Sequence, residues 1–271
     1  MARPYIEFVQ TQNVDWVTLP DRTSVKRLNG DPESGEETYL IRYPAGFQST
    51  DRGPEDRAEE TLVIDGEIMI GETLHGYHGY GFTPRGESAG ARSTTDGATL
   101  LVFRYGRDDP NSVSGACEAI TVDPTTVPWD MSASDGRIAH LRLARKVLRL
   151  GPNDSSRTFL LIGLPHGKPP ADAMPAEIHD HFEEMFMLQG EMWMPEGKIR
   201  PGAYFYRPPG IVHGPHVSLS GFFQIMRAGA NYVRTEWTAP VPLPIGAPYN
   251  PAIPEGTPDS WTRPYVGPDL Y

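Results

Sequence analysis

Residues 59–67, Glu-Glu-Thr-Leu-Val-Ile-Asp-Gly-Glu, return 124 residues later as residues 183–191, Glu-Glu-Met-Phe-Met-Leu-Gln-Gly-Glu. The same spacing carries the turn Pro84-Arg-Gly86 onto Pro208-Pro-Gly210. A fixed spacing between several separated landmarks is typical of an internal duplication. We therefore expect the chain to contain two copies of one domain.

The residue pattern around the repeat favours strands over helices. The 271 residues include 28 Gly and 28 Pro, spread along the whole chain. Long helices do not tolerate that density, because Pro removes a backbone donor and Gly costs backbone entropy. The apolar runs are short and bounded by turn residues, which is typical of strands in a sandwich or barrel. Residues 137–150 fit either a short basic helix or a strand.

Composition excludes several classes of protein. With 24 Lys and Arg against 35 Asp and Glu, the formal charge is −11, which argues against nucleic acid or an anionic membrane surface as a partner. No stretch approaches the roughly 18 apolar residues of a spanning helix, and the N-terminus does not resemble a signal peptide. The single cysteine, Cys117, fits a reducing compartment. We expect a soluble cytoplasmic protein that acts on a small molecule.

Four of the eight histidines lie between residues 179 and 216. Glu177, His179 and His181 would share one face of a strand, because side chains alternate with a period of two. Imidazole and carboxylate ligands together suit divalent iron, manganese, nickel, zinc or copper. His213 follows a rigid Pro-Pro-Gly turn and would complete such a site if the two segments fold together. His216 fits a supporting role better than a ligand.

The second copy resembles a cupin. Gly202, Pro208, Gly210 and His213 match the second cupin motif at every spacing. The resemblance implies a metal site and gives His213 the role of a ligand. Arg207 lies beside this motif and is a candidate for holding an anionic substrate, with a surface role as the alternative.

The first cupin motif is matched with one departure. Glu183 lies seven residues before Gly190, as the family motif has it. Counting back from Glu183 places the second motif histidine on His179, while the first falls on Glu177 instead of a histidine. A shorter loop, with His179 and His181 as the pair, is the alternative.

The resemblance covers both copies but implies a metal in only one. In the first copy Ala89 stands where the second has His213, and Glu55 stands where it has His179. We therefore expect an all-β protein of two tandem cupin-type, jelly-roll barrels. The expected divisions are an N-terminal barrel without metal ligands, a linker, a metal-binding barrel and a Pro-rich extended tail: residues 1–106, 107–140, 141–237 and 238–271.

The resemblance also implies a function. His179, Glu183 and His213, with Glu177 as a fourth ligand, would hold one divalent metal per chain, with Fe(II) favoured over Zn, Mn, Ni or Cu. Glu177 and His181 are the candidate catalytic residues, His181 as an acid or base. The implied activity is an iron dioxygenase that cleaves a C–C bond of a small phenolic or dicarbonyl substrate. The alternatives are an O2-independent lyase, isomerase or hydrolase, and a non-catalytic binding protein. Because a barrel has edges that the tail could cover in a partner, we expect a homodimer.

Overall fold

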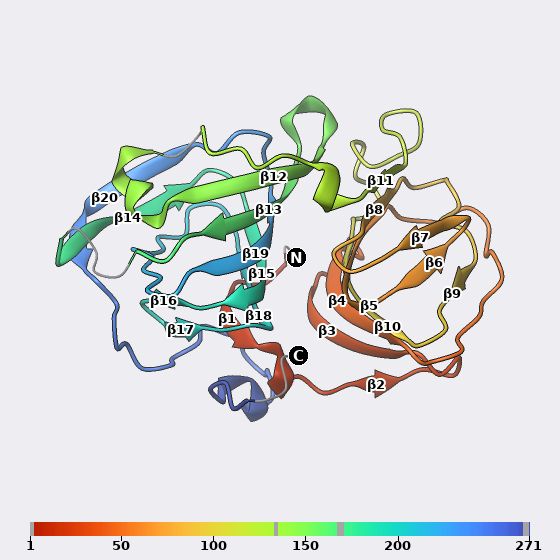
Figure 1. The fold of residues 1–271 in the computed structure, drawn as a ribbon, viewed down its shortest axis with the longest axis horizontal. Helices are drawn as coiled ribbons and strands as arrows, with labels where there is room; N and C mark the ends of the chain where they lie inside the picture. Colours follow the sequence, from red (N-terminus) through yellow and green to blue (C-terminus); the bar gives the residue numbers. More distant parts are fainter. Residues whose placement is uncertain (1–2, 133–134, 167–170, 268–270) are drawn as a thin grey trace. The chain divides into compact units, whose positions relative to one another are not determined.

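The computed structural model describes residues 3–132, 135–166, 171–267 and 271. The chain folds into two compact units. Strands dominate both units, so the predicted all-β class of two tandem barrels is confirmed (Figure 1). The helices among these residues are short 3₁₀ turns, and none is long and apolar enough to span a membrane. They are η1 Thr11–Asn13, η2 Pro124–Thr126, η3 Gly136–Leu141, η4 Pro152–Asp154 and η5 Asp259–Thr262.

The first unit is a barrel built mainly from residues Asp15–Val127. Its main sheet has the order β11-β8-β5-β10-β4-β3-β2, and a smaller sheet has the order β7-β6-β9. The strands are β2 Val17–Thr18, β3 Ser24–Gly30, β4 Glu37–Tyr43, β5 Glu59–Gly66, β6 Ile68–Ile70, β7 Thr73–His75, β8 Tyr80–Thr83, β9 Arg92–Ser93, β10 Ala98–Arg104 and β11 Ile120–Val122.

The second unit is a barrel whose strands β18-β15-β19-β13-β12 follow the order of β8-β5-β10-β4-β3 in the first. Its main sheet runs β1-β18-β15-β19-β13-β12, and two two-stranded sheets, β14-β20 and β16-β17, accompany it. The strands are β1 Ile6–Gln10, β12 Leu143–Leu150, β13 Arg157–Gly163, β14 Ala173–His179, β15 Glu183–Gly190, β16 Met192–Met194, β17 Gly197–Ile199, β18 Ala203–Arg207, β19 Phe222–Ala228 and β20 Thr235–Pro242.

The repeated glycine explains why the two copies share a local sequence. Gly66 and Gly190 both have a positive φ, +70° and +77°, at the end of equivalent strands. A Cβ at Gly190 would lie 2.2 Å from the carbonyl oxygen of Gly221, and one at Gly66 would lie 2.2 Å from that of Gly97. Only glycine fits this turn and this close approach of two backbones.

The edge strand of the second barrel comes from an unexpected part of the chain. β11 pairs with β8 in the first barrel, whereas β1 pairs with the equivalent β18 in the second. Residues Pro4–Val14 therefore belong to the second unit. The predicted assignment of all of residues 1–106 to the first barrel was wrong there, because sequence adjacency does not determine which sheet edge a strand joins.

Two other predicted boundaries also shift. The predicted linker 107–140 contains β11, so most of it belongs to the first barrel. Residues 137–150 form the end of the 3₁₀ turn η3 and then the strand β12, not a helix.

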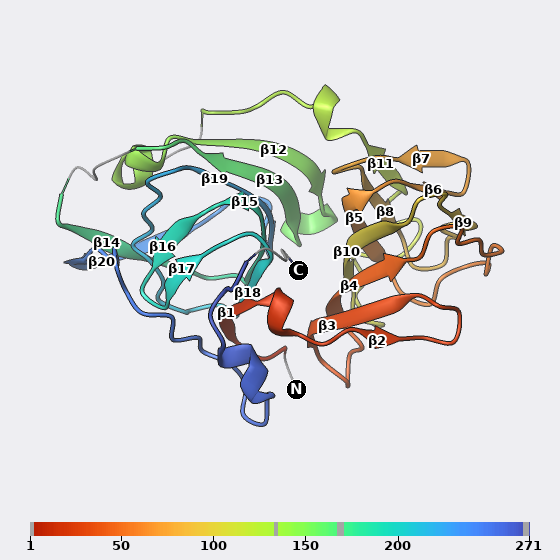
Figure 2. The ribbon, with the colours of Figure 1, turned by 60° about the horizontal axis from the view of Figure 1, so that its bottom comes forward.

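The predicted tail begins inside β20 and then crosses back to the N-terminal strand (Figure 2). The hydroxyl of Tyr249 donates to the backbone oxygen of Phe8 at 3.0 Å, and the two rings are 5.3 Å apart. The tail therefore packs on its own chain. Its residues 268–270 lie outside the described part of the chain.

Candidate metal centre

The ligand candidates come from two segments that the backbone joins. Glu177 and His179 lie at the end of β14 and share one face, as the alternation predicts. His213 follows β18 and forms an isolated antiparallel bridge with Glu177. The amide of Glu177 donates to the oxygen of His213 at 2.8 Å, and the amide of His213 donates back at 3.0 Å. This pairing brings residues 36 positions apart in the sequence to the same point.

Glu177, His179 and His213 form a group whose ligand atoms all lie within 4.8 Å of one another. All three sit inside the second barrel, where His179 and His213 are nearly buried, and their two rings are 4.9 Å apart. The structure therefore brings together the set that includes Glu177, in agreement with the preferred alignment of the first motif.

Nδ1 of each imidazole is hydrogen-bonded to a backbone carbonyl oxygen. Nδ1 of His179 lies 3.1 Å from the oxygen of Arg234, and Nδ1 of His213 lies 3.0 Å from that of Ile211. A carbonyl oxygen can only accept, so each Nδ1 carries a proton, and in the neutral ring Nε2 then keeps its lone pair. This is how metal-binding histidines are normally oriented. The two Nε2 atoms are thus prepared as ligands.

Electrostatics favour the metal-binding forms of His213 and Glu177. Burial, with the positive charge of Arg207, lowers the pKa of His213 far below its usual range, so its ring is neutral. Burial alone would raise the pKa of Glu177, but the hydrogen bond and charge of His216, together with His179, hold it below its usual value. Neutral imidazoles and an ionised carboxylate are the forms that bind a divalent cation. The residues present therefore fit a metal.

Glu183 lies beside both imidazoles. Its Oε1 is 3.4 Å from Nε2 of His179, and its Oε2 is 3.3 Å from Nε2 of His213. The neighbouring Glu184 bonds instead to the hydroxyl of Tyr204 at 2.6 Å. The alternation of β15 thus directs Glu183, and not Glu184, to the centre.

The two remaining histidines differ in position. His216 lines the cavity at the centre, with Nδ1 3.5 Å from a carboxylate oxygen of Glu177. His181 is stacked 5.3 Å from the ring of His179, and its Nδ1 lies 2.8 Å from Asp180. His181 is not among the residues that line the cavity. Its role as an acid or base stays a prediction.

A strand that the sequence prediction misplaced supports the centre. Arg207 is buried, and its Nη1 donates to Glu183 at 3.2 Å while its Nε and Nη2 donate to Glu7 on β1. Arg207 is therefore neither a surface residue nor free to bind substrate. The alternation of Ile6-Glu7-Phe8 was a signal for this strand, but nothing in the sequence placed it in the second barrel.

The ligand candidates border a cavity of about 280 Å³. Its wall contains polar and charged side chains, among them those of the metal group (Glu177, His179 and His213), Arg145, Arg157 and Gln224. The rest is apolar and comes from Ile138, Leu141, Leu143, Phe159, Leu161, Met192, Phe205, Phe222, Met226, Val233 and Trp237. The cavity can therefore take a small molecule with a polar end and an apolar body.

The family is settled by a match over both barrels. The sequence model of the ChrR cupin-like domain matches residues 6–106 and 118–231. The chain belongs to this cupin family. None of the curated proteins matches the sequence.

Solved structures of the cupin fold resemble most of the chain. A "putative dioxygenase" from Nostoc punctiforme has a TM-score of 0.74 and 22% identity, covering 88% of this chain and 92% of its own. The protein Ylba from E. coli has a TM-score of 0.60 and 13% identity, covering 84% and 92%. The oxalate decarboxylase of Lactobacillus farciminis has a TM-score of 0.56 and 8% identity, covering 85% and 88%. At these identities the likeness shows the fold.

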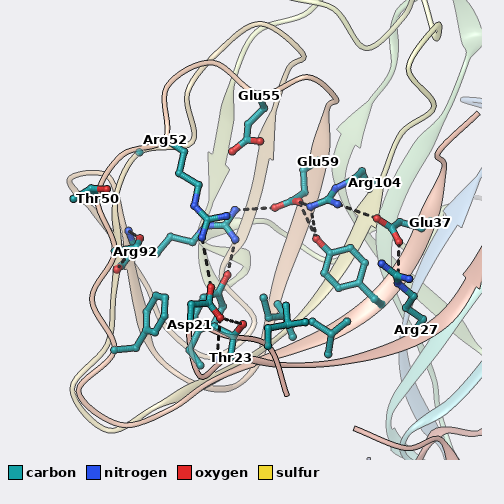
Figure 3. Close-up of a pocket in the computed structure, with 18 residues that line it drawn as sticks. Asp21, Thr23, Arg27, Glu37, Thr50, Arg52, Glu55, Glu59, Arg92 and Arg104 are labelled. Carbon is teal, nitrogen blue, oxygen red and sulfur yellow. Dashed lines mark hydrogen bonds and ion pairs between the residues drawn. The ribbon is translucent and has the colours of Figure 1, made fainter. Parts of the chain in front are cut away.

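In the first cupin barrel, arginines surround the carboxylate that corresponds to Glu183 (Figure 3). Glu59 accepts from Arg92 at 2.8 Å and from Arg104 at 3.0 Å. Burial would raise the pKa of Glu59, but these two guanidinium groups outweigh it and lower the pKa to about 2. In this barrel two cations therefore lie against the carboxylate, in a cavity of about 220 Å³.

Proposed function

We propose that the second cupin barrel is the active site of a metal-dependent dioxygenase that cleaves a C–C bond in a small phenolic or dicarbonyl substrate. The observation that carries the proposal is the group of Glu177, His179 and His213 in the wall of a cavity that is also lined by apolar side chains. Two histidines and one carboxylate are the ligand set typical of non-haem Fe(II) oxygenases. The neighbour from Nostoc punctiforme, itself described as a putative dioxygenase, agrees with this choice.

Each residue of the centre has a task in this proposal. Nε2 of His179, Nε2 of His213 and the carboxylate of Glu177 hold the metal, and Glu183 is the candidate fourth ligand. When bound, Fe(II) supplies open coordination positions and the redox chemistry with O2. His216 keeps Glu177 ionised, and Arg207 orients Glu183. The apolar wall excludes water and takes the substrate's ring or acyl group.

A second candidate function keeps the site and changes the metal. Two carboxylates, Glu177 and Glu183, lie next to the two imidazoles. A set with that much oxygen also suits Mn(II), and Zn or Ni would serve an O2-independent lyase, isomerase or hydrolase. Metal analysis of the native protein separates this candidate from the first.

The test is turnover with controlled metal and oxygen. The protein is freed of metal, loaded anaerobically with Fe(II), and given phenolic and diketone substrates with and without O2. The proposal predicts product only with O2, with labelled oxygen from O2 at both carbons of the cleaved C–C bond, whether these lie in one ring-opened product or in two fragments. Undiminished turnover without O2 would rule out the oxygenase and favour the second candidate.

A further inference from the structure

Arg157 is a buried cation, and two of its three guanidinium nitrogens make no hydrogen bond to the described residues. It is the first residue of β13, and only 5% of its surface is exposed. Its Nε and Nη2 atoms have no hydrogen-bond partner among the described residues. Buried charges are normally paired, because removing a charge from water is costly unless a partner compensates. A guanidinium with free donors in the wall of a cavity is suited to bind an anion.

The sheet register places Arg157 level with Glu183, and both residues line the cavity. Arg157 is opposite Ala228 on β19, and Ala228 is opposite Glu183 on β15. Residues directly opposite one another point to the same face. Two strand spacings of about 4.8 Å separate the positions of Arg157 and Glu183, roughly 10 Å in all. The side chain between them, that of Ala228, is a single methyl group.

The side chains around Arg157 indicate the chemical character of the rest of such an anionic ligand. The guanidinium carbon lies 4.5 Å from the centre of the Phe159 ring. The next row of the sheet, Phe159, Met226, Met185 and Phe205, is apolar. Gln224 lies one row further on, and its Oε1 also has no partner among the described residues. Along the sheet, starting from the row of Glu183, the cavity thus offers a cation, an apolar surface and an amide.

The other arginines of the cavity are engaged. Arg207 is bonded to Glu7 and Glu183, so it has no free edge for a substrate. The backbone of Arg145 pairs with that of Asp130, whose charge also acts on the Arg145 side chain. Arg157 is the cation of this cavity with unsatisfied donors.

We propose that Arg157 binds the carboxylate of the substrate, so that the substrate is a small carboxylic acid with an apolar body. A carboxylate matches the planar fork of a guanidinium and can accept two hydrogen bonds from it. The acid group lies at the level of Glu183, and the apolar body extends over Phe159 and Met226. This inference deepens the proposed function, since it names the substrate class of the same site.

The test compares an acid with its uncharged analogue. Binding of 3-phenylpropanoate and of 3-phenylpropanamide is measured by calorimetry on full-length protein, both metal-free and loaded with Zn(II). The acid should bind at least about ten times more tightly than the amide, because hydrogen bonds to charged groups contribute that much or more. Arg157→Met should remove this preference and leave the affinity for the amide unchanged. Arg157→Lys, which keeps the charge but loses the fork, should retain part of it.

The melting temperature distinguishes a binding role from a structural one. Removing a buried charge with unsatisfied donors should leave the melting temperature of Arg157→Met equal to or above that of the unaltered protein. The matched control is Arg200→Met, which removes one charge from the same barrel outside the cavity and should change neither affinity. Unaltered protein that shows no preference for the acid overturns the inference, whatever the variants do. So does an Arg157→Met protein that retains the preference.

The outcome is separable from that of the proposed function. Acid binding by the metal-free protein depends on neither metal nor O2. If the protein turns over substrate with O2 but does not prefer the acid, only the inferred substrate class is wrong. If it prefers the acid but shows no O2-dependent turnover, only the proposed dioxygenase activity is wrong.

Discussion

Replacing Glu59 by Gln should destabilise the first barrel in a pH-dependent way. Arg92 and Arg104 lower the pKa of Glu59 from its usual 4.5 to about 2, against the opposing effect of burial. A difference of about 2.5 pKa units corresponds to about 3 kcal/mol of stability supplied by the ionised group. Glu59→Gln removes that contribution at neutral pH.

The sign of the pH dependence follows from the lowered pKa. Because the folded value lies below the unfolded one, the stabilisation is fully present above about pH 4.5 and is lost as the pH falls toward 2. The gap in stability between the unaltered protein and Glu59→Gln should therefore be widest near pH 7 and should narrow below pH 4.5. Amide hydrogen exchange in β5 and β10 reports this local stability directly.

The control for Glu59 is Glu55, a second carboxylate in the wall of the same cavity. Glu55 makes no ion pair with the described residues, so Glu55→Gln should change protection by well under 1 kcal/mol. The reasoning about the paired arginines would be refuted if Glu59→Gln and the unaltered protein showed equal protection from amide exchange at pH 7. It would also be refuted if the difference in their stability did not change with pH.

Two further predictions concern the second barrel. Glu7→Gln removes one partner of a buried pair with Arg207, so the second barrel should lose about 3–5 kcal/mol of stability, measured by urea denaturation. The control is Glu191→Gln, which breaks the more exposed pair with Lys198 and should cost less than about 1 kcal/mol. Equal losses of stability in the two variants would contradict the role of β1. His181→Asn should keep the metal stoichiometry of the unaltered protein, since His181 does not line the cavity; elemental analysis that finds the metal lost would show that His181 is a ligand.

Local patterns were sufficient to predict the barrels and most of the centre. The repeat predicted two equivalent domains, because the same turn at Gly66 and Gly190 demands glycine in both copies. Alternation placed Glu177 and His179 on one face of a strand, and the motif spacing identified His213. These are properties of short segments, which a sequence shows directly.

Long-range pairing was not predictable in the same way. β1 joins β18 across about 200 residues of sequence, and it carries Glu7 to Arg207. The choice between two equivalent barrel edges depends on packing that no local pattern records. The two free donors of Arg157 are likewise visible only when all its neighbours are placed. The sequence shows the residue types, and the fold decides which of them meet.

The most direct test of the account is the metal content of His213→Ala. His213 supplies one Nε2 to the group with Glu177 and His179, and its loss leaves two ligands of that group. Elemental analysis after dialysis should find about one divalent metal per chain in the unaltered protein and almost none in the variant. The circular dichroism of the metal-free proteins should be alike, as expected of barrels that fold without the ion. A variant that retains stoichiometric metal, or an unaltered protein that binds none, would contradict the metal centre itself.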